Sequence, residues 1–258
     1  MKVVRLVVTG WLFQLKTLSL SGFFVLTSVF MPVVVATVAF YMFQAGQREG
    51  TLFWAALGSA VYGIWSSTLF GSGGAIQWQR WQGTLELLVA APAPFFLVVL
   101  PLTLATATIG IYSLCATLLW GKIAFGIPFT LAQPLAFALA VPVTILGLGL
   151  LGLVFASTFV LYRHANSLSN MLEWPVLLVT GLLLPVSQLQ DWTHPIAWAL
   201  APYWGINALR SAALGIGWSA WANIAITLAL GALYYVIGSV CLRHFVTAAR
   251  RKATLSLT

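Results

Sequence analysis

Residues 135–160 read LAFALAVPVTILGLGLLGLVFASTFV and contain no charged side chain. A helix rises about 1.5 Å per residue, so a run of this length crosses the roughly 30 Å hydrocarbon core of a bilayer. Because lipid offers no hydrogen bonds to an exposed backbone, such a run must form a helix, whose amide and carbonyl groups pair with each other. The alternation of apolar and polar residues that marks a membrane strand is absent. The stretch therefore predicts a transmembrane helix.

Five further apolar stretches of similar length lie on either side of this one. Together they predict an all-α integral membrane protein, in which residues 1–258 form a single transmembrane domain. The six predicted spans are Gly22–Phe43, Leu52–Gly73, Phe95–Trp120, Leu135–Val160, Met171–Ser187 and Trp218–Leu242.

The composition of the chain fits a surface that faces lipid. Of its 258 residues, 61% are hydrophobic and 6% are charged, whereas a soluble domain has about 25% charged residues in its hydrated surface. The net charge is +8, but the basic residues lie at the ends of apolar runs and form no continuous stripe. This distribution argues against a nucleic-acid partner and indicates the orientation of the chain instead.

The basic residues divide unequally between the two sides of the predicted bundle. Cytoplasmic segments of membrane proteins are richer in Lys and Arg, so the division predicts that both termini are cytoplasmic. The richer side holds Lys2, Arg5, Lys16, Arg80, Arg163, Arg243, Arg250, Arg251 and Lys252, and the other side holds Arg48, Lys122 and Arg210.

Two segments outside the spans are expected at the membrane surface. Residues 3–19 alternate apolar positions with Arg5 and Lys16, a pattern typical of a helix in the cytoplasmic interface; an extended leader is the alternative. Residues 188–210 are too polar and too rich in proline to span the bilayer. They are expected to form a re-entrant segment between the fifth and sixth spans, or else a surface loop with interfacial tryptophans, which are Trp192, Trp198 and Trp204.

Gly147–Gly152 imitates a dinucleotide-binding motif, since it has the spacing G-x-G-x-x-G and Glu173 follows about 20 residues later. That motif requires a preceding strand and a helix N-terminus directed at the pyrophosphate. Here it lies within a predicted span, where glycines permit close packing of helices. The sequence also lacks the phosphate-binding pattern G-x-x-x-x-G-K-S/T. No nucleotide-binding site is therefore expected on this chain.

The residues that usually form metal or proton-coupling sites are scattered. His164, His194 and His244 fall in different loops, which argues against a metal site. None of the acidic residues is expected at the middle of a span, where proton-coupled carriers keep a carboxylate. The sequence therefore predicts no catalytic residue, no metal ligand and no cofactor on this chain. The acidic residues are Glu49, Glu86, Glu173 and Asp191.

The most informative segment lies between the second and third spans, where residues 77–94 read QWQRWQGTLELLVAAPAP. Thr84 can cap a short helix with several leucines, and the prolines would end this helix before the third span. Such a helix would lie at the cytoplasmic membrane surface and offer Arg80 and Glu86 to a cytosolic partner. A purely structural connector is the alternative.

One phrase of this segment resembles the signature of type 2 ABC transporter permeases, the membrane subunits of exporters for drugs, nodulation lipo-oligosaccharides and surface polysaccharides. It reads Arg80-x-x-Gly83-Thr84-Leu85-Glu86-Leu87-Leu88 and is followed by Ala91-Pro92. An acidic–basic pair often precedes Gly-Thr-Leu-Glu in that family, whereas this chain has Gln79-Arg80-Trp81-Gln82. The resemblance covers nearly the whole chain and includes residues 175–181, Pro185, Pro195, Pro202 and Arg210.

The resemblance implies a coupling helix, at about residues 80–90, that fits into a cleft of a separate ATPase subunit. That subunit would bind ATP and Mg²⁺. It also implies two permease subunits, identical or homologous, paired in the plasma membrane. The expected coupling residues are Arg80, Gly83, Thr84, Leu85, Glu86, Leu87 and Leu88.

The same family analogy places a substrate path along spans one, two and five. These spans are rich in aromatic and small residues, which in the alternative interpretation face lipid or pack within the bundle. The expected path residues are Phe23, Phe30, Trp54, Trp65 and Leu178.

The expected path has no ring of acidic or basic residues, so an amphipathic or hydrophobic cargo is favoured over a free ion. An exported drug or antibiotic is the first expectation, and a lipid-linked glycan or polysaccharide is the second. A passive channel or secondary carrier is the alternative from another class, and it would need a polar site within the membrane. A membrane-embedded enzyme would need a cluster of His or acidic residues at one membrane face.

Overall fold

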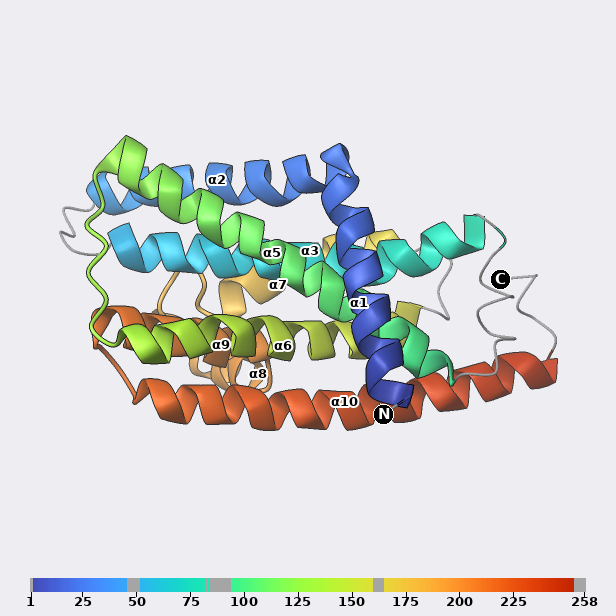
Figure 1. The fold of residues 1–258 in the computed structure, drawn as a ribbon. Coiled ribbons are helices and arrows are strands. Elements are labelled where there is room, and N and C mark those ends of the chain that lie inside the picture. Colours follow the sequence, from blue (N-terminus) through green and yellow to red (C-terminus); the bar gives the residue numbers. More distant parts are fainter. Residues whose placement is uncertain (1, 46–51, 82, 84–93, 160–164, 253–258) are drawn as a thin grey trace.

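The structure is a computed structural model that describes residues 2–45, 52–81, 83, 94–159 and 165–252. Every regular element within these ranges is a helix, so the all-α fold class is confirmed (Figure 1). The elements are α1 (Lys2–Leu20), α2 (Gly22–Ala45), α3 (Leu52–Trp81), α5 (Phe95–Phe125), α6 (Pro134–Phe159), α7 (Ala165–Val179), η1 (Val186–Gln188), η2 (Asp191–Thr193), α8 (His194–Trp198), α9 (Ala201–Leu214) and α10 (Ala220–Lys252).

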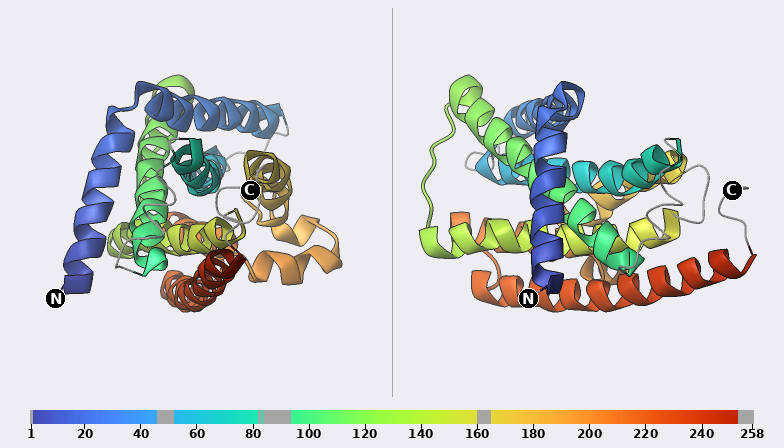
Figure 2. Two further views of the ribbon diagram at one scale, coloured as in Figure 1. Left: turned by 90° about the vertical axis from the view of Figure 1, so that its right-hand side faces the viewer. Right: turned by 45° about the vertical axis from the view of Figure 1, so that its right-hand side comes forward.

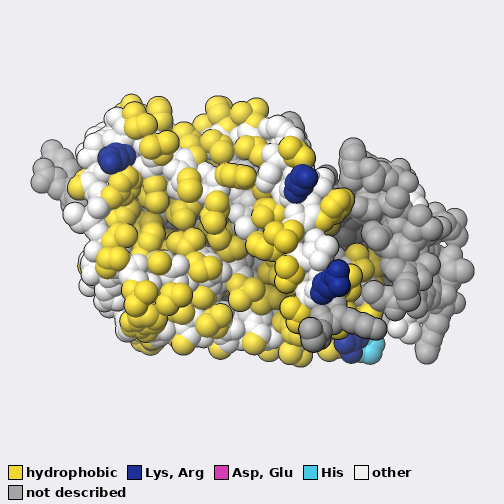
Figure 3. All heavy atoms as spheres, in the orientation of Figure 1, with side chains coloured by type: hydrophobic (Ala, Val, Ile, Leu, Met, Phe, Trp, Pro, Cys, Tyr) yellow, Lys and Arg dark blue, Asp and Glu magenta, His cyan; other side chains and the backbone are white. Residues whose placement is uncertain are grey.

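In the described part of the chain, five helices are long and apolar enough to cross a membrane. Four of them, α2, α5, α6 and α10, coincide with predicted spans one, three, four and six. The fifth is α1, whose apolar stretch Val3–Leu20 has no fully buried residue. Helices α3 and α7 correspond to predicted spans two and five and are not among the five, so the count of six spans stays a prediction. Hydrophobic side chains cover most of the face in Figure 3, with few Lys and Arg side chains between them.

Helix α7 differs most from its predicted span. It covers Ala165–Val179 rather than residues 171–187, and its 15 residues correspond to about 22 Å of helix, less than the thickness of the hydrocarbon core. The chain turns after it, because Gly181 has a φ of 76°, a left-handed conformation that glycine adopts at little cost. Short helices continue the chain from Val186 onward.

Helix α1 lies across the long helices of the bundle (Figures 1 and 2). Two hydrogen bonds hold it on α5: Trp11 Nε1 donates to Thr108 Oγ1 at 3.1 Å, and the Tyr112 hydroxyl donates to Ser19 Oγ at 3.2 Å. Its apolar side chains are largely exposed; Phe13, for example, is 70% exposed. The crosswise position suits the predicted interfacial helix, whose depth in a membrane stays a prediction.

Trp11→Phe should loosen α1 from α5 without unfolding the bundle. The change removes a single partly buried hydrogen bond, so we expect the free energy of unfolding to fall by about 0.5–1 kcal/mol. A thermal unfolding scan of the purified chain in detergent measures this loss. Trp221→Phe, at a side chain that is 49% exposed, is the control. An equal shift in both variants would contradict a specific role for the Trp11 hydrogen bond.

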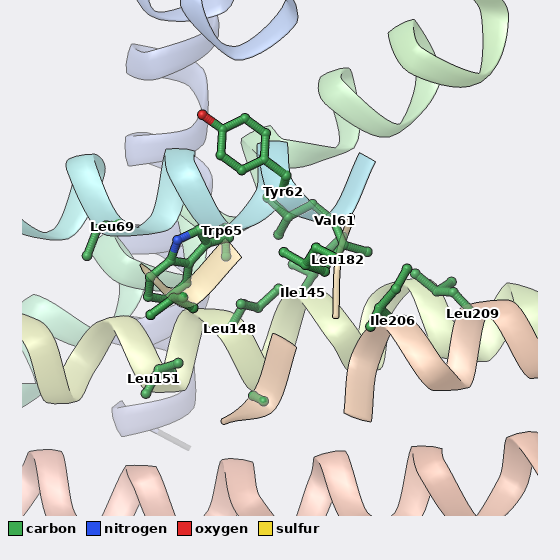
Figure 4. Packing of buried hydrophobic residues seen from close by; sticks show 14 of the residues in the cluster. Val61, Tyr62, Trp65, Leu69, Ile145, Leu148, Leu151, Leu182, Ile206 and Leu209 are labelled. Atoms are coloured by element: carbon green, nitrogen blue, oxygen red, sulfur yellow. The ribbon is translucent and has the colours of Figure 1, made fainter. Parts of the chain in front are cut away.

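Helix α3 forms the centre of the bundle. Its residues between Ala55 and Leu69 are almost all buried, and it packs closely against α5 and α6 (Figure 4). Small residues permit this packing, since a Cβ atom on Gly63 would lie 1.7 Å from Ser113 Oγ of α5. The buried hydroxyls of Ser59, Ser67 and Thr68 donate hydrogen bonds to carbonyls of their own helix, as Thr68 Oγ1 does to the Ile64 carbonyl at 2.7 Å. The centre of the fold therefore uses the close contacts that helices make in lipid.

The glycines of Gly147–Gly152 lie within α6. A Cβ atom on Gly149 would be 2.9 Å from Leu104, and one on Gly152 would be 2.7 Å from Thr68. These glycines allow α6 to approach α5 and α3, which confirms the packing interpretation of the motif.

Candidate functional site

Helices α2 and α7 both pack against α3 (Figure 2, left), and side chains of all three helices line a groove. We call it the α2–α3–α7 groove. It encloses a cavity of about 480 Å³ with mainly apolar walls. Phe24 and Met31 of α2, Phe70 of α3 and Trp174 of α7 supply large apolar side chains to these walls. The groove therefore belongs to predicted spans one, two and five, the spans assigned to the substrate path.

The carboxylate of Glu173 lies inside this groove. The Tyr62 hydroxyl and Ser66 Oγ each donate a hydrogen bond to Glu173 Oε1, both at 2.8 Å. These two donors are four residues apart, so they lie on one face of α3, and Ser66 is close to the middle of that helix. Figure 4 shows the Tyr62 side chain on the side of α3 away from α6.

This position of Glu173 corrects one expectation from the sequence. Glu173 was expected near the end of a span that begins at Met171, but α7 begins at Ala165, which places Glu173 near the middle of α7. Because α7 packs against α3, the carboxylate reaches Tyr62 and Ser66 near the middle of that helix. The carboxylate therefore lies among the helices of the bundle, and its depth in a membrane stays a prediction.

Arg210 lies where α3 begins and just beyond the end of α7. It is 5% exposed, and its guanidinium carbon lies 3.2 Å from the centre of the Trp54 ring. Its Nη1 donates to the Gly181 carbonyl at 2.7 Å, and its Nη2 donates to the carbonyls of Leu182 at 2.8 Å and Trp54 at 3.3 Å. One side chain of α9 therefore connects the chain beyond α7 to the start of α3.

Arg210 is buried, and its assignment to the outer side of the membrane stays a prediction. The positive-inside count treats such residues as solvated, but this guanidinium is enclosed among carbonyl groups. The close packing depends on Gly58 of α3, because a Cβ atom there would lie 1.8 Å from the Leu182 carbonyl oxygen and 2.7 Å from Arg210 Nη2.

A second cavity, of about 640 Å³, lies beside Arg210. It is lined in part by α8, α9 and the start of α10. The Tyr234 hydroxyl of α10 holds the α8–α9 junction, because it donates a hydrogen bond to the Ala199 carbonyl at 2.6 Å. Within the expected re-entrant segment, residues 188–210, the chain forms short helices; its depth in a membrane stays a prediction. The aromatic lining residues of the cavity are Trp54, Trp198, Tyr203, Trp204 and Trp218.

The predicted path residues within the described part of the structure differ in their surroundings, and their role stays a prediction. Trp65 is fully buried and packs edge-on against Phe155 of α6, with ring centres 5.7 Å apart, and Figure 4 shows it pointing toward α6. Phe30 is 58% exposed and Leu178 is 47% exposed. Trp54 lines the cavity beside Arg210. Phe23 belongs to α2, and its side chain lies outside the described part of the structure.

The coupling residues are only partly within the described part of the chain. Arg80 lies in the last turn of α3, which ends at Trp81. Gly83 is exposed and has a φ of 67°, the left-handed conformation with which many helices end. Residues 84–88, and with them most of the predicted coupling helix, lie outside the described residues.

Long apolar helices, a crosswise N-terminal helix and a groove between three helices together define a helical membrane protein with an internal site. The chain matches the ABC-2 type transporter family over residues 6–214, from α1 to the end of α9. The chain therefore belongs to the ABC-2 type transporter family, and the resemblance seen in the sequence is confirmed. It is a membrane component of a transport system that works with an ATP-binding ABC partner. A comparison with curated proteins finds no match.

Proposed function

We propose that this chain is the membrane subunit of an ATP-driven exporter in the plasma membrane. It carries an amphipathic or hydrophobic compound, such as a drug or antibiotic, and a separate subunit binds ATP and Mg²⁺. Two such chains, or this chain and a homologue, form the membrane part, with their termini in the cytoplasm. The observation that supports this proposal is the α2–α3–α7 groove, a mainly apolar cavity with one carboxylate, in a chain of the ABC-2 family.

Helix α3 suits the task of transmitting movement from the ATPase to the groove. It is one helix of 30 residues, about 45 Å long, and thus longer than the hydrocarbon core of a membrane. Ser66, near the middle of α3, contacts Glu173. Arg80 lies in the last turn of α3, directly before the segment from Gly83 to Leu88. Closure of the ATPase subunits would push on this segment, tilt α3 as a rod and change the width of the groove.

The second candidate cargo is a lipid-linked glycan or polysaccharide. The cavity beside Arg210 supports it, since aromatic rings stack on sugars and this cavity has five aromatic side chains together with Asn207 and Asn223. The alternative from another class is a passive channel or secondary carrier. The position of Glu173 among α2, α3 and α7 supports this alternative, because a channel or carrier needs a polar site within the membrane.

Transport into sealed vesicles separates these classes. The full chain is reconstituted with its ATPase subunit, and uptake of a fluorescent amphipathic compound is measured with ATP and without it. The proposal expects uptake only with ATP. Uptake that proceeds equally without ATP, down a concentration gradient, would instead indicate a channel or carrier.

Glu86→Ala should weaken the association with the ATPase. The change removes a polar side chain from the predicted coupling helix, so we expect copurification of the ATPase to fall by about tenfold. Glu49→Ala is the matched control, since it removes an acidic residue from a loop predicted on the opposite side of the membrane. Normal copurification and transport with Glu86→Ala would show that Glu86 has no role in docking.

A further inference from the structure

We propose that the α2–α3–α7 groove binds organic cations, molecules with a protonated amine on an apolar body, and that Glu173 is the counterion of the amine. This inference rests on the proposed export function and adds to it the charge of the cargo. The cavity of about 480 Å³ lies within the range of about 300–1,000 Å³ that drug-sized ligands occupy.

Among the described residues, the hydrogen bonds of Glu173 use only one of its two oxygen atoms. Both described donors, the Tyr62 hydroxyl and Ser66 Oγ, bond to Oε1. These bonds hold the carboxylate in one orientation, and the described residues place no hydrogen-bond donor on Oε2. Both donors are neutral hydroxyls, so they orient the carboxylate without neutralising it. A cation from outside would compensate the charge in surroundings of low polarity.

The charges of the surrounding helices favour a cation. The sequence of α2 contains no charged residue, and Glu173 is the only one in α7. The only charged residue in α3 is Arg80, which is 14 residues beyond Ser66 and thus about 21 Å along the helix. The groove therefore has a charge of its own that attracts amines and repels organic anions.

An aromatic ring lies beside the carboxylate. The Trp174 ring is 56% exposed, and its centre is 6.4 Å from that of the Tyr62 ring, at an angle of 33° between the planes. The indole face attracts cations, and tryptophan is the strongest of the aromatic side chains in this respect. Met31, which is 54% exposed, adds a flexible apolar side chain that adapts to different ligand shapes. The amine would lie near Glu173 and the apolar body along α2.

A pair of fluorescent probes tests this inference on the full chain in nanodiscs. Dansylcadaverine has a primary amine that is protonated at neutral pH, and its N-acetyl derivative has the same apolar body without the charge. Energy transfer from tryptophan to the dansyl group reports binding, and it requires neither ATP nor the ATPase. We expect the cationic probe to bind at least about tenfold more tightly than the neutral one.

Glu173→Gln should remove this preference, because the amide keeps the shape of the side chain but loses its charge. The cationic probe is expected to bind about tenfold more weakly to this variant, while the neutral probe binds as before. Asp191→Asn, at an exposed acidic residue of η2, is expected to change neither affinity. Ser66→Ala keeps the carboxylate and loses one of its two hydrogen bonds, so a loss of about threefold is expected for the cationic probe alone.

Three results would overturn the inference. Equal weakening of both probes in Glu173→Gln would show that Glu173 only supports the fold. Binding of the cationic probe that is lost when phosphatidylethanolamine replaces phosphatidylcholine in the nanodisc would identify a lipid amine as the occupant. Binding that disappears when the chain dimerises would show that a second copy covers the groove. If Glu173 selects the amine but no ATP-dependent transport occurs, this inference holds and the proposed export fails.

Discussion

Arg210→Met is expected to lower the midpoint of thermal unfolding by about 6 °C or more. The guanidinium donates three hydrogen bonds, to the carbonyls of Gly181, Leu182 and Trp54. Methionine fills similar space but leaves the carbonyls of Gly181 and Leu182 without this donor, at a cost of roughly 3 kcal/mol in total. Since the three carbonyls belong to the start of α3 and to the turn after α7, the damage should concentrate where α9 meets these elements.

Two further substitutions identify the cause of this loss. Arg5→Met removes a charge from the exposed surface of α1 and should leave the unfolding midpoint unchanged. Arg210→Lys keeps the charge but offers a compact ammonium in place of the planar guanidinium, so it should recover only part of the stability. If Arg210→Met were as stable as the unchanged chain, the carbonyl contacts would contribute nothing to the fold.

Gly58→Val is expected to prevent normal packing of α3. The first carbon of the new side chain would lie 1.8 Å from the Leu182 carbonyl oxygen, which is backbone and cannot rotate away. The turn after α7 must therefore move, and overpacking of this kind costs about 3 kcal/mol. We expect a broad, aggregated profile in size-exclusion chromatography and a lower midpoint of unfolding.

Gly22→Ala is the matched control for this variant, because a Cβ atom on Gly22 would meet nothing within 4 Å. A monodisperse Gly58→Val protein with an unchanged midpoint would contradict the close approach of α3 to Leu182. The double variant Gly58→Val, Arg210→Met should lose less stability than the sum of the two changes, since both act on the contact between Arg210 and the Leu182 carbonyl.

Hydropathy was sufficient to predict four of the helices that are long and apolar enough to cross a membrane. The predicted spans that match α2, α5, α6 and α10 are long runs without charge, and no tertiary contact is needed to recognise them. Helix α7 was less predictable, because its first turns contain Asn166, Ser167 and Asn170 and resemble a loop. Ser169 from these turns is buried and bonds to the Leu69 carbonyl, a contact that the sequence of α7 alone does not reveal.

The candidate site depends on the helix face on which each residue lies, and composition does not specify that face. Trp65 was expected along the substrate path because it is aromatic, but it packs against Phe155 in the core. Glu173 was set aside because the start of its helix was placed six residues too late. The sequence does show that Tyr62 and Ser66 share one face of a helix, because they are four residues apart. Only the packing of α7 on α3 shows that this face meets an acidic residue.

Helix α3 contributes to all three candidate sites. Trp54 lines the cavity beside Arg210, and Tyr62 and Ser66 line the α2–α3–α7 groove. The predicted coupling segment follows the end of the helix. A mutation in α3 that adapts one of these would disturb the others, so natural variation in this helix is expected to be narrow. Helices α2 and α7 each supply a single wall of the groove and expose other side chains at their surface. Related chains that acquired different cargoes are therefore expected to have diverged first in α2 and α7.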